Sequence, residues 1–167
     1  GLARERAPSL PALPATLSKA TAMLSHARTL TIEWGDCDPA GIVFYPRYLA
    51  MFNASTDAML QAAGINASAL FKRHQAIGWP MVDTHASFSL PTAYGDQVRI
   101  CSSVVEVART RFHIRHQLYA EDGRLGVNCL DQRVWAVAHP QRPGELERAR
   151  LPDDRRQAPT SQGPTRW

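Results

Sequence analysis

The sequence of 167 residues lacks any apolar run near the roughly 18 residues that a membrane-spanning helix needs. Charged residues make up only 20% of the chain and apolar residues 44%, which is typical of a soluble globular protein. Residues 1–16 are rich in proline and alanine and lack the sustained hydrophobic segment of a secretory signal peptide. We therefore expect one compact domain with a buried core and no association with a membrane.

Cysteine is scarce: the chain has only Cys37, Cys101 and Cys129. An odd count argues against a disulfide framework and fits a reducing cytoplasm, where we expect the protein to reside. No pair of cysteines has the spacing of zinc ligands, and His113 and His116 are three apart in a predicted strand, so they face opposite ways. We expect no metal site. For Cys37, a small buried residue is favoured over a nucleophile, because no histidine is near it in the sequence.

A strong excess of one charge is also missing, since the net charge is +4. Many basic residues lie in or beside two proline-rich tails, which argues against nucleic-acid binding but leaves room for a ligand that carries phosphate. We predict an N-terminal extension over residues 1–27 with a short helix over 17–27, a domain over 28–139 and a C-terminal tail over 140–167. The prolines forbid a regular helix at the front of the extension.

The domain begins with a predicted strand over 28–34 and a long helix over 45–63 that Gly64 ends. The predicted apolar stripe of that helix consists of Tyr45, Leu49, Phe52, Thr56, Met59, Leu60 and Ala63. A shorter helix is predicted over 66–75, with Asn66 or Ser68 as its cap. Four predicted strands then follow, over residues 81–90, 97–107, 111–120 and 125–138. Short turns join these strands, so the fold class is α+β, an antiparallel sheet with one principal helix on one face.

The most informative segment is the Pro/Gly-rich turn before the long helix, which contains Asp36 and Asp38. A helix amino end presents unpaired backbone N–H groups and a positive dipole. A carboxylate beside such donors can attack a carbonyl or activate water to do so. From the residues alone, a helix cap or an Asx turn is the alternative for Asp38.

The run Asp-Cys-Asp-Pro-Ala-Gly-Ile-Val over residues 36–43, followed by Tyr45-Pro46, resembles the hot-dog fold thioesterases, most of all the 4-hydroxybenzoyl-CoA thioesterase branch. The resemblance covers residues 28–139 and implies an antiparallel sheet wrapped around one long central helix. It implies that Asp38 is the catalytic carboxylate and that the backbone N–H of Tyr45 polarises the thioester carbonyl. The ring of Tyr45 could instead be core.

Other residues of the turn have structural interpretations. Asp36 is favoured as an acceptor for backbone N–H groups that orders the turn. Pro39 and Gly41 are interpreted as turn residues at the substrate site, and Gly41 could supply a positive φ or allow close approach of the ligand.

Asn53 matches the position where the 4-hydroxybenzoyl branch has an aspartate that receives the phenol. An amide can still hydrogen-bond a hydroxyl, but it lacks the charge that selects a phenol strongly. Another aromatic or a medium-length acyl group is therefore equally compatible, and a polar residue at the helix edge is the alternative for Asn53. Arg109, Arg111 and Arg133 resemble family positions near the nucleotide, where they would contact phosphate; solvated surface arginines are the alternative.

The resulting hypothesis is an enzyme, an acyl-CoA thioesterase that hydrolyses an aromatic or short- to medium-chain acyl-CoA. Coenzyme A enters as part of the substrate, and no cofactor is expected. The resemblance also implies a homodimer or homotetramer with Asp38 of one subunit facing Asn53 of another. The alternatives are a non-hydrolytic hot-dog domain that binds acyl-CoA or acyl carrier protein, and an interaction protein for acidic partners. A dehydratase is disfavoured because its chemistry needs a histidine and the turn has none.

Overall fold

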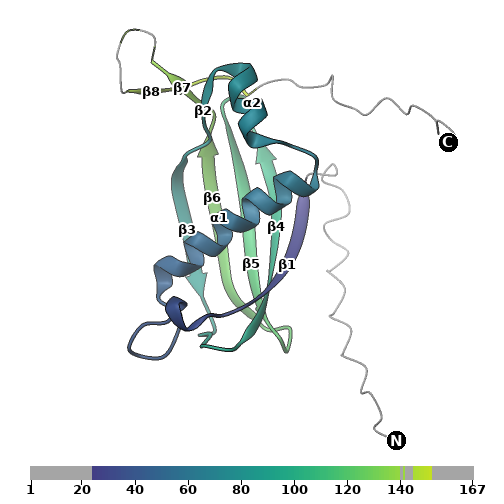
Figure 1. Cartoon of the computed structure of the whole chain (residues 1–167), viewed down its shortest axis with the longest axis vertical. Helices are drawn as coiled ribbons and strands as arrows, with labels where there is room; N and C mark the ends of the chain where they lie inside the picture. Colours follow the sequence, from purple (N-terminus) through teal and green to yellow (C-terminus); the bar gives the residue numbers. More distant parts are fainter. Residues whose placement is uncertain (1–23, 140, 142–144, 152–167) are drawn as a thin grey trace, which may run out of the picture.

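The computed structural model describes residues 24–139, 141 and 145–151. Its main body is a five-stranded antiparallel sheet with strand order β1-β4-β5-β6-β3, and helix α1 lies diagonally across one face of this sheet (Figure 1). The elements are β1 (Ser25–Thr31), the 3-10 helix η2 (Trp34–Asp36), α1 (Tyr45–Ala62), α2 (Ala67–His74), β2 (Ala76–Gly78), β3 (Met81–Phe88), β4 (Gln97–Val107), β5 (Arg111–Ala120), β6 (Leu125–Val134), β7 (Ala136–Ala138) and β8 (Leu146–Arg148). The predicted α+β class is confirmed.

Helix α1 forms where the sequence predicts it, but its buried face is rotated. Phe44 is the extended N-cap residue, Pro46 occupies the first turn where its missing N–H costs nothing, and Gly64 follows the helix with φ +76°. The buried residues are Tyr48, Met51, Phe52, Ser55, Thr56, Met59 and Leu60. Tyr45 is 63% exposed, so its ring is not part of the core and the predicted stripe is wrong at its first position.

The core fills the space between α1 and the sheet. Strand β4 alternates between buried and half-buried positions, as expected when one face of a sheet is covered by a helix. The larger cluster includes Ile32, Phe52, Ile100, Leu118 and Val127, all at most 1% exposed. These side chains come from α1, three strands and the segment after β1, so the core fixes the start of α1 against the sheet.

Some predicted boundaries are wrong. The first strand covers Ser25–Thr31 rather than 28–34, because η2 takes up the residues that follow it. The predicted helix over 17–27 lies mostly outside the described residues, and its last three belong to β1. A small sheet of order β2-β7-β8, whose short β2 and β8 the sequence did not indicate, lies beside α2 at one end of the molecule (Figure 1). The loop between β1 and α1 lies at the opposite end.

Strand β3 forms one edge of the main sheet and is poorly covered. Of its eight residues only Ala86 is half-buried, and the others are exposed. Its exposed apolar side chains are Met81, Val82 and Phe88. An uncovered apolar edge strand favours pairing with another chain. Among the described residues, no helix is both long and apolar enough to cross a membrane.

Truncating Leu118 tests the core. Leu118 is 0% exposed in the larger cluster, so Leu118→Ala should lower the free energy of unfolding by about 2–5 kcal/mol through lost burial and a residual cavity. Val107→Ala is the matched control, because Val107 is 58% exposed and its loss should change stability by no more than about 0.5 kcal/mol. Urea unfolding measures both, and equal effects of the two variants would contradict this description of the core.

Candidate active site

The turn before α1 is a small irregular hairpin. Cys37 and Val43 form an antiparallel bridge, and the N–H of Asp38 donates to the carbonyl of Ile42 at 3.0 Å. The N–H of Gly41 donates to the carbonyl of Asp38 at 2.9 Å, and Gly41 has φ +80°, which residues with a Cβ rarely adopt. This pairing sets Asp38 directly beside the segment that enters α1. The prediction of a positive φ at Gly41 is confirmed, while Pro39 lies exposed in the same turn.

Asp36 clamps this turn to the first turn of the helix. The residue is 7% exposed, and its Oδ1 accepts from Nε and Nη2 of Arg47 at 2.9 and 2.7 Å. Its Oδ2 accepts from the backbone N–H of Glu33 at 3.0 Å, and its carbonyl accepts from the N–H of Phe44. A buried carboxylate with this many donors orders the backbone around it. The structural interpretation of Asp36 agrees with these contacts, and Arg47 is a partner that sequence reasoning missed.

Asp38 is half-buried and has one carboxylate oxygen free. Its Oδ1 accepts from the backbone N–H of Ala40 at 2.8 Å, which is the Asx-type contact that the sequence offered as an alternative. Its Oδ2 has no partner within the described part of the chain. The turn therefore holds the carboxylate in one orientation and leaves an oxygen for a reacting group.

The N–H of Tyr45 is the donor left over at the start of α1. The N–H of Phe44 donates to Asp36, Pro46 has none, and the N–H of Arg47 donates to the carbonyl of Phe44 at 2.8 Å. For the N–H of Tyr45, the described residues supply no acceptor. An unpaired N–H at a helix start stabilises developing negative charge, as an oxyanion site requires.

A chain of polar contacts lies beneath α1, between the helix and the sheet. Ser102 Oγ lies 2.8 Å from Nδ1 of His116, and Nε2 of His116 lies 3.5 Å from Oδ2 of Asp131. Oδ2 of Asp131 accepts from Nη2 of Arg133 at 3.2 Å, and Nη1 of Arg133 donates to Oδ1 of Asn53 at 3.1 Å. Only Asn53 is exposed; the other four residues are at most 5% exposed.

Within this series of contacts, the buried carboxylate of Asp131 pairs with the buried guanidinium of Arg133. Burial alone would raise the pKa of Asp131, but hydrogen bonds from His116 and Thr84 outweigh it and lower that pKa to about 2. Thr84 donates to Oδ1 of Asp131 at 2.8 Å from the edge strand. Ser102, His116 and Asp131 are therefore interpreted as a buried structural network rather than a nucleophilic triad, since each is at most 2% exposed.

The three predicted phosphate ligands are placed differently. Arg133 is 5% exposed and engaged with Asp131 and Asn53, so it supports the helix instead of facing a nucleotide. Arg109 and Arg111 are exposed at the turn between β4 and β5, where Arg111 Nη2 lies 3.9 Å from Glu106 Oε1. That turn lies at the end of β4 opposite to Gln97, near which the Asp38 loop is held, so one chain does not bring these arginines to Asp38.

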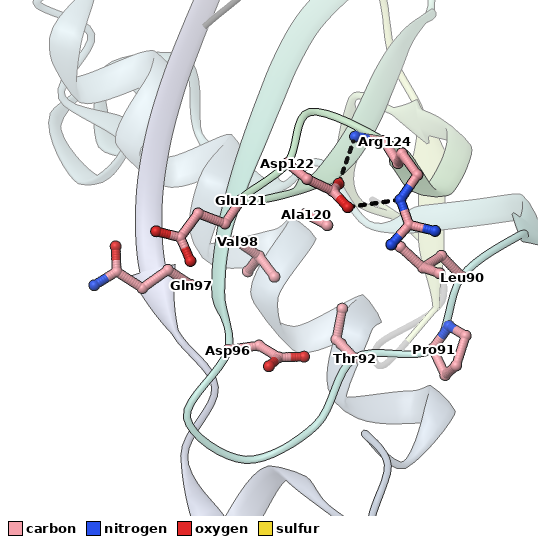
Figure 2. Close-up of a pocket in the computed structure, with 10 residues that line it drawn as sticks. All are labelled: Leu90, Pro91, Thr92, Asp96, Gln97, Val98, Ala120, Glu121, Asp122 and Arg124. Carbon is pink, nitrogen blue, oxygen red and sulfur yellow. Dashed lines mark hydrogen bonds and ion pairs between the residues drawn. The ribbon is translucent and has the colours of Figure 1, made fainter. Parts of the chain in front are cut away.

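A cavity of about 540 Å³ lies beside the β5–β6 hairpin, but no predicted site residue lines it (Figure 2). Asp122 and Arg124 form an ion pair at its rim, with Nε 2.7 Å from Oδ2, and Thr92 lies on the opposite wall. Thr92 connects the cavity to the helix, since its Oγ1 lies 2.8 Å from the hydroxyl of Tyr48. This hollow of a single chain therefore does not enclose Asp38.

Two inward-facing charges in β6 could have indicated the buried network. Asp131 and Arg133 are two apart in a strand whose alternate residues are buried, so both face α1. Charged residues at such positions are paired, because an unpaired buried charge is strongly unfavourable. His116 occupies an inward position of β5 in the same way.

Acid should weaken the fold through Asp131. Its pKa in the folded chain, about 2, lies below the ordinary 3.8, so its stabilising contribution is complete above about pH 4 and is lost as the pH falls toward 2. Lowering the pH from about 6 to about 3 should reduce the free energy of unfolding of the wild type by about 1 kcal/mol through protonation of Asp131. Urea unfolding of wild type and Asp131→Asn checks this, since the variant should lack this component. An identical pH slope in both would contradict the assignment.

Comparison with known proteins identifies the family. The model of the Thioesterase-like superfamily matches residues 32–158. The 4-hydroxybenzoyl-CoA thioesterase of Pseudomonas sp. strain CBS-3 is 33% identical over 130 residues, 72% of this chain and 92% of that protein. The 1,4-dihydroxy-2-naphthoyl-CoA hydrolase of Crocosphaera subtropica is 29% identical over 92 residues, 55% of this chain and 66%, just under two thirds, of that protein.

A solved structure agrees. A mutant 4-hydroxybenzoyl CoA thioesterase complexed with 4-hydroxybenzoyl CoA is similar with a TM-score of 0.70 at 29% identity, over 78% of this chain and 94% of that one. The family model therefore covers most of the domain, and the structural match covers most of both chains. The chain belongs to the Thioesterase-like superfamily and has the hot-dog fold.

Proposed function

We propose that this protein hydrolyses an aromatic acyl-CoA thioester to the free acid and coenzyme A. The observation that carries the proposal is that the turn before α1 contains two groups without a partner among the described residues, Oδ2 of Asp38 and the N–H of Tyr45. The named relatives support the substrate class, because they act on 4-hydroxybenzoyl-CoA and 1,4-dihydroxy-2-naphthoyl-CoA. The three cysteines are free, which agrees with a reducing compartment such as the cytoplasm.

The reaction follows from these two groups. The thioester carbonyl oxygen accepts a hydrogen bond from the N–H of Tyr45, where the helix dipole favours negative charge. Asp38 then either removes a proton from the attacking water or attacks the carbonyl carbon itself to form an anhydride that water hydrolyses. In both routes the C–S bond breaks, and the thiolate of coenzyme A leaves and takes up a proton. Direct attack puts the oxygen of water into the acid, whereas hydrolysis of the anhydride puts it into the acid or into Asp38, depending on which carbonyl water attacks. A thioester suits a weak carboxylate nucleophile, because the thiolate leaves readily.

A second copy of the chain completes the site in this proposal. The exposed edge strand β3 offers apolar side chains and unpaired backbone groups to an identical strand. Two such strands related by a two-fold axis run antiparallel. The end of one sheet beside the β1–α1 loop then lies next to the end of the partner's sheet that has the β4–β5 turn. Asp38 of one protomer would then approach Asn53 of the other and come nearer to the end of the partner's sheet that bears Arg109 and Arg111. A homodimer is the smallest assembly with this arrangement, and a homotetramer could contain it twice.

Replacing the carboxylate of Asp38 should abolish most turnover. Asp38→Asn keeps the Asx-type acceptor but removes the charge, so kcat should fall by about a hundredfold or more with KM little changed. The assay is release of the coenzyme A thiol from a panel of acyl-CoAs, and Asp122→Asn on the exposed β5–β6 turn is the control that should keep its rate. Near-normal turnover by Asp38→Asn would refute the assignment. Binding of acyl-CoA without thiol release by the wild type would favour a non-hydrolytic domain.

A charge on β3 should separate the protomers. Val82 is 43% exposed on the edge strand, and Val82→Lys places two like charges at the proposed two-fold contact, so the dimer dissociation constant should rise at least about tenfold. Light scattering over a concentration series measures the change, and thiol release should fall in parallel as monomer accumulates. Val107→Lys, at the exposed end of β4, is the control that should remain dimeric. A wild type that is monomeric and fully active would disprove the role of the second copy.

A further inference from the structure

The contact between Asn53 and Arg133 fixes which way the Asn53 amide points. A guanidinium carries only N–H donors and no acceptor, so the atom that faces Nη1 of Arg133 at 3.1 Å must be the amide oxygen. The amide nitrogen of Asn53 consequently points away from Arg133. It has no partner among the described residues, and Asn53 itself is exposed on α1.

Buried residues beneath α1 hold the side-chain amide of Asn53 in this orientation. The side chain of Arg133 is 6% exposed and that of Asp131 is 3% exposed, with the two joined at 3.2 Å. Asp131 is in turn held by Thr84 and His116. The Nε of Arg133 is already without a partner, so rotation of the Asn53 amide would leave a second buried donor unpaired and bring two donors together. Asn53 therefore presents N–H groups, and only those, to whatever approaches this face of α1.

The buried network also determines the net charge beside the side chain of Asn53. Asp131 and Arg133 form a neutral pair, and Asn53 adds no charge of its own. A carboxylate at the position of Asn53 would accept hydrogen bonds and repel an anion. The amide with its oxygen occupied does the opposite: it donates hydrogen bonds and tolerates or attracts an anion. Arg133 also pairs across the sheet with Met81 of β3, so the amide lies on the side of α1 that faces the proposed dimer edge.

We propose that Arg133 is a positioning residue that makes Asn53 a dedicated hydrogen-bond donor, so that the site prefers aromatic acyl groups with an acceptor or anionic ring substituent. The inference rests on the proposed function for the presence of an acyl group at Asn53. A ring hydroxyl is admitted, because it can accept as well as donate, but a ring carboxylate is preferred. An unsubstituted ring leaves the donor without a partner.

Binding to the Asp38→Asn variant tests this independently of turnover. The ligands are benzoyl-CoA, 4-hydroxybenzoyl-CoA and 4-carboxybenzoyl-CoA, and titration calorimetry gives each dissociation constant. We expect 4-carboxybenzoyl-CoA to bind at least about tenfold more tightly than benzoyl-CoA, with 4-hydroxybenzoyl-CoA between them. Adding Asn53→Asp should reverse the order, so that 4-carboxybenzoyl-CoA binds at least about tenfold more weakly than 4-hydroxybenzoyl-CoA.

A second variant isolates the positioning role of Arg133. Arg133→Met together with Asp131→Leu removes both buried charges, so that neither is left unpaired, and frees the amide to rotate. The preference for 4-carboxybenzoyl-CoA over benzoyl-CoA should shrink to within about threefold, while the affinity for benzoyl-CoA stays unchanged. Arg124→Met with Asp122→Leu removes the exposed ion pair of the β5–β6 turn and is the matched control, which should keep the full preference.

The outcomes are distinct. Equal binding of the three ligands by the Asp38→Asn variant, or an unchanged order in Asn53→Asp, overturns the inference even when the wild type hydrolyses acyl-CoAs. The expected order of binding with no thiol release by the wild type supports the inference and refutes the hydrolytic function. Failure to bind any of the three ligands overturns both. Loss of affinity for all three ligands alike in the double variant would show that Arg133 is structural only.

Discussion

The buried carboxylate of Asp36 is the contact on which the geometry of this end of the molecule depends. It joins the backbone after β1 to the side chain of Arg47 in the first turn of α1, and its own carbonyl accepts from the residue that caps the helix. A helix start is costly to fix, because several backbone dihedrals are ordered for few hydrogen bonds. The hydrogen bonds of Asp36 with Glu33 and Arg47 offset this cost from outside the helix. They also leave Tyr45 with an N–H for which the described residues supply no acceptor, and Asp38 lies in the turn directly before it.

The second constraint is the burial of charge beneath the same helix. Most of the space between α1 and the sheet is apolar, yet Asp131, Arg133 and His116 lie within it. Such groups gain little stability over apolar ones of the same shape, because removing charges from water is unfavourable. Their contribution here is to fix side-chain orientations. Each hydrogen bond limits the orientation of the next side chain, from Ser102 in the sheet to Asn53 on the surface of the helix. A surface amide with no such support would sample both of its orientations.

The features of the fold and of the candidate site that could be predicted are those marked by residues close together in the sequence. The bounds of α1 were nearly correct because Pro46 and Gly64 mark them chemically, and those of β4 and β5 were correct because side chains alternate over ten or more residues. The single strand predicted over 125–138 was wrong at its end, since it divides at Trp135 into β6 and β7, which belong to different sheets. The strands β2 and β8 have three residues each, too few to show a period. The hot-dog fold and the turn with Asp38 could be predicted from one specific run of residues. The burial of Arg133 was missed because an arginine is read as exposed unless its inward register and its partner are considered together.

Asp38 lies at one end of the sheet and does not line the cavity beside the β5–β6 hairpin, and this placement bears on how a substrate could be covered. A thioester is protected from bulk water only where protein covers it, and electrostatic stabilisation by one N–H is worth most where water is excluded. The described part of one chain supplies the carboxylate and the donor but places Asn53 farther along α1 and Arg109 at the other end of β4. An exposed edge strand beside the Asn53 face is the feature that can bring these groups together in space. The uncovered apolar edge and the separation of these residues within one chain are the two observations on which the proposed dimer rests.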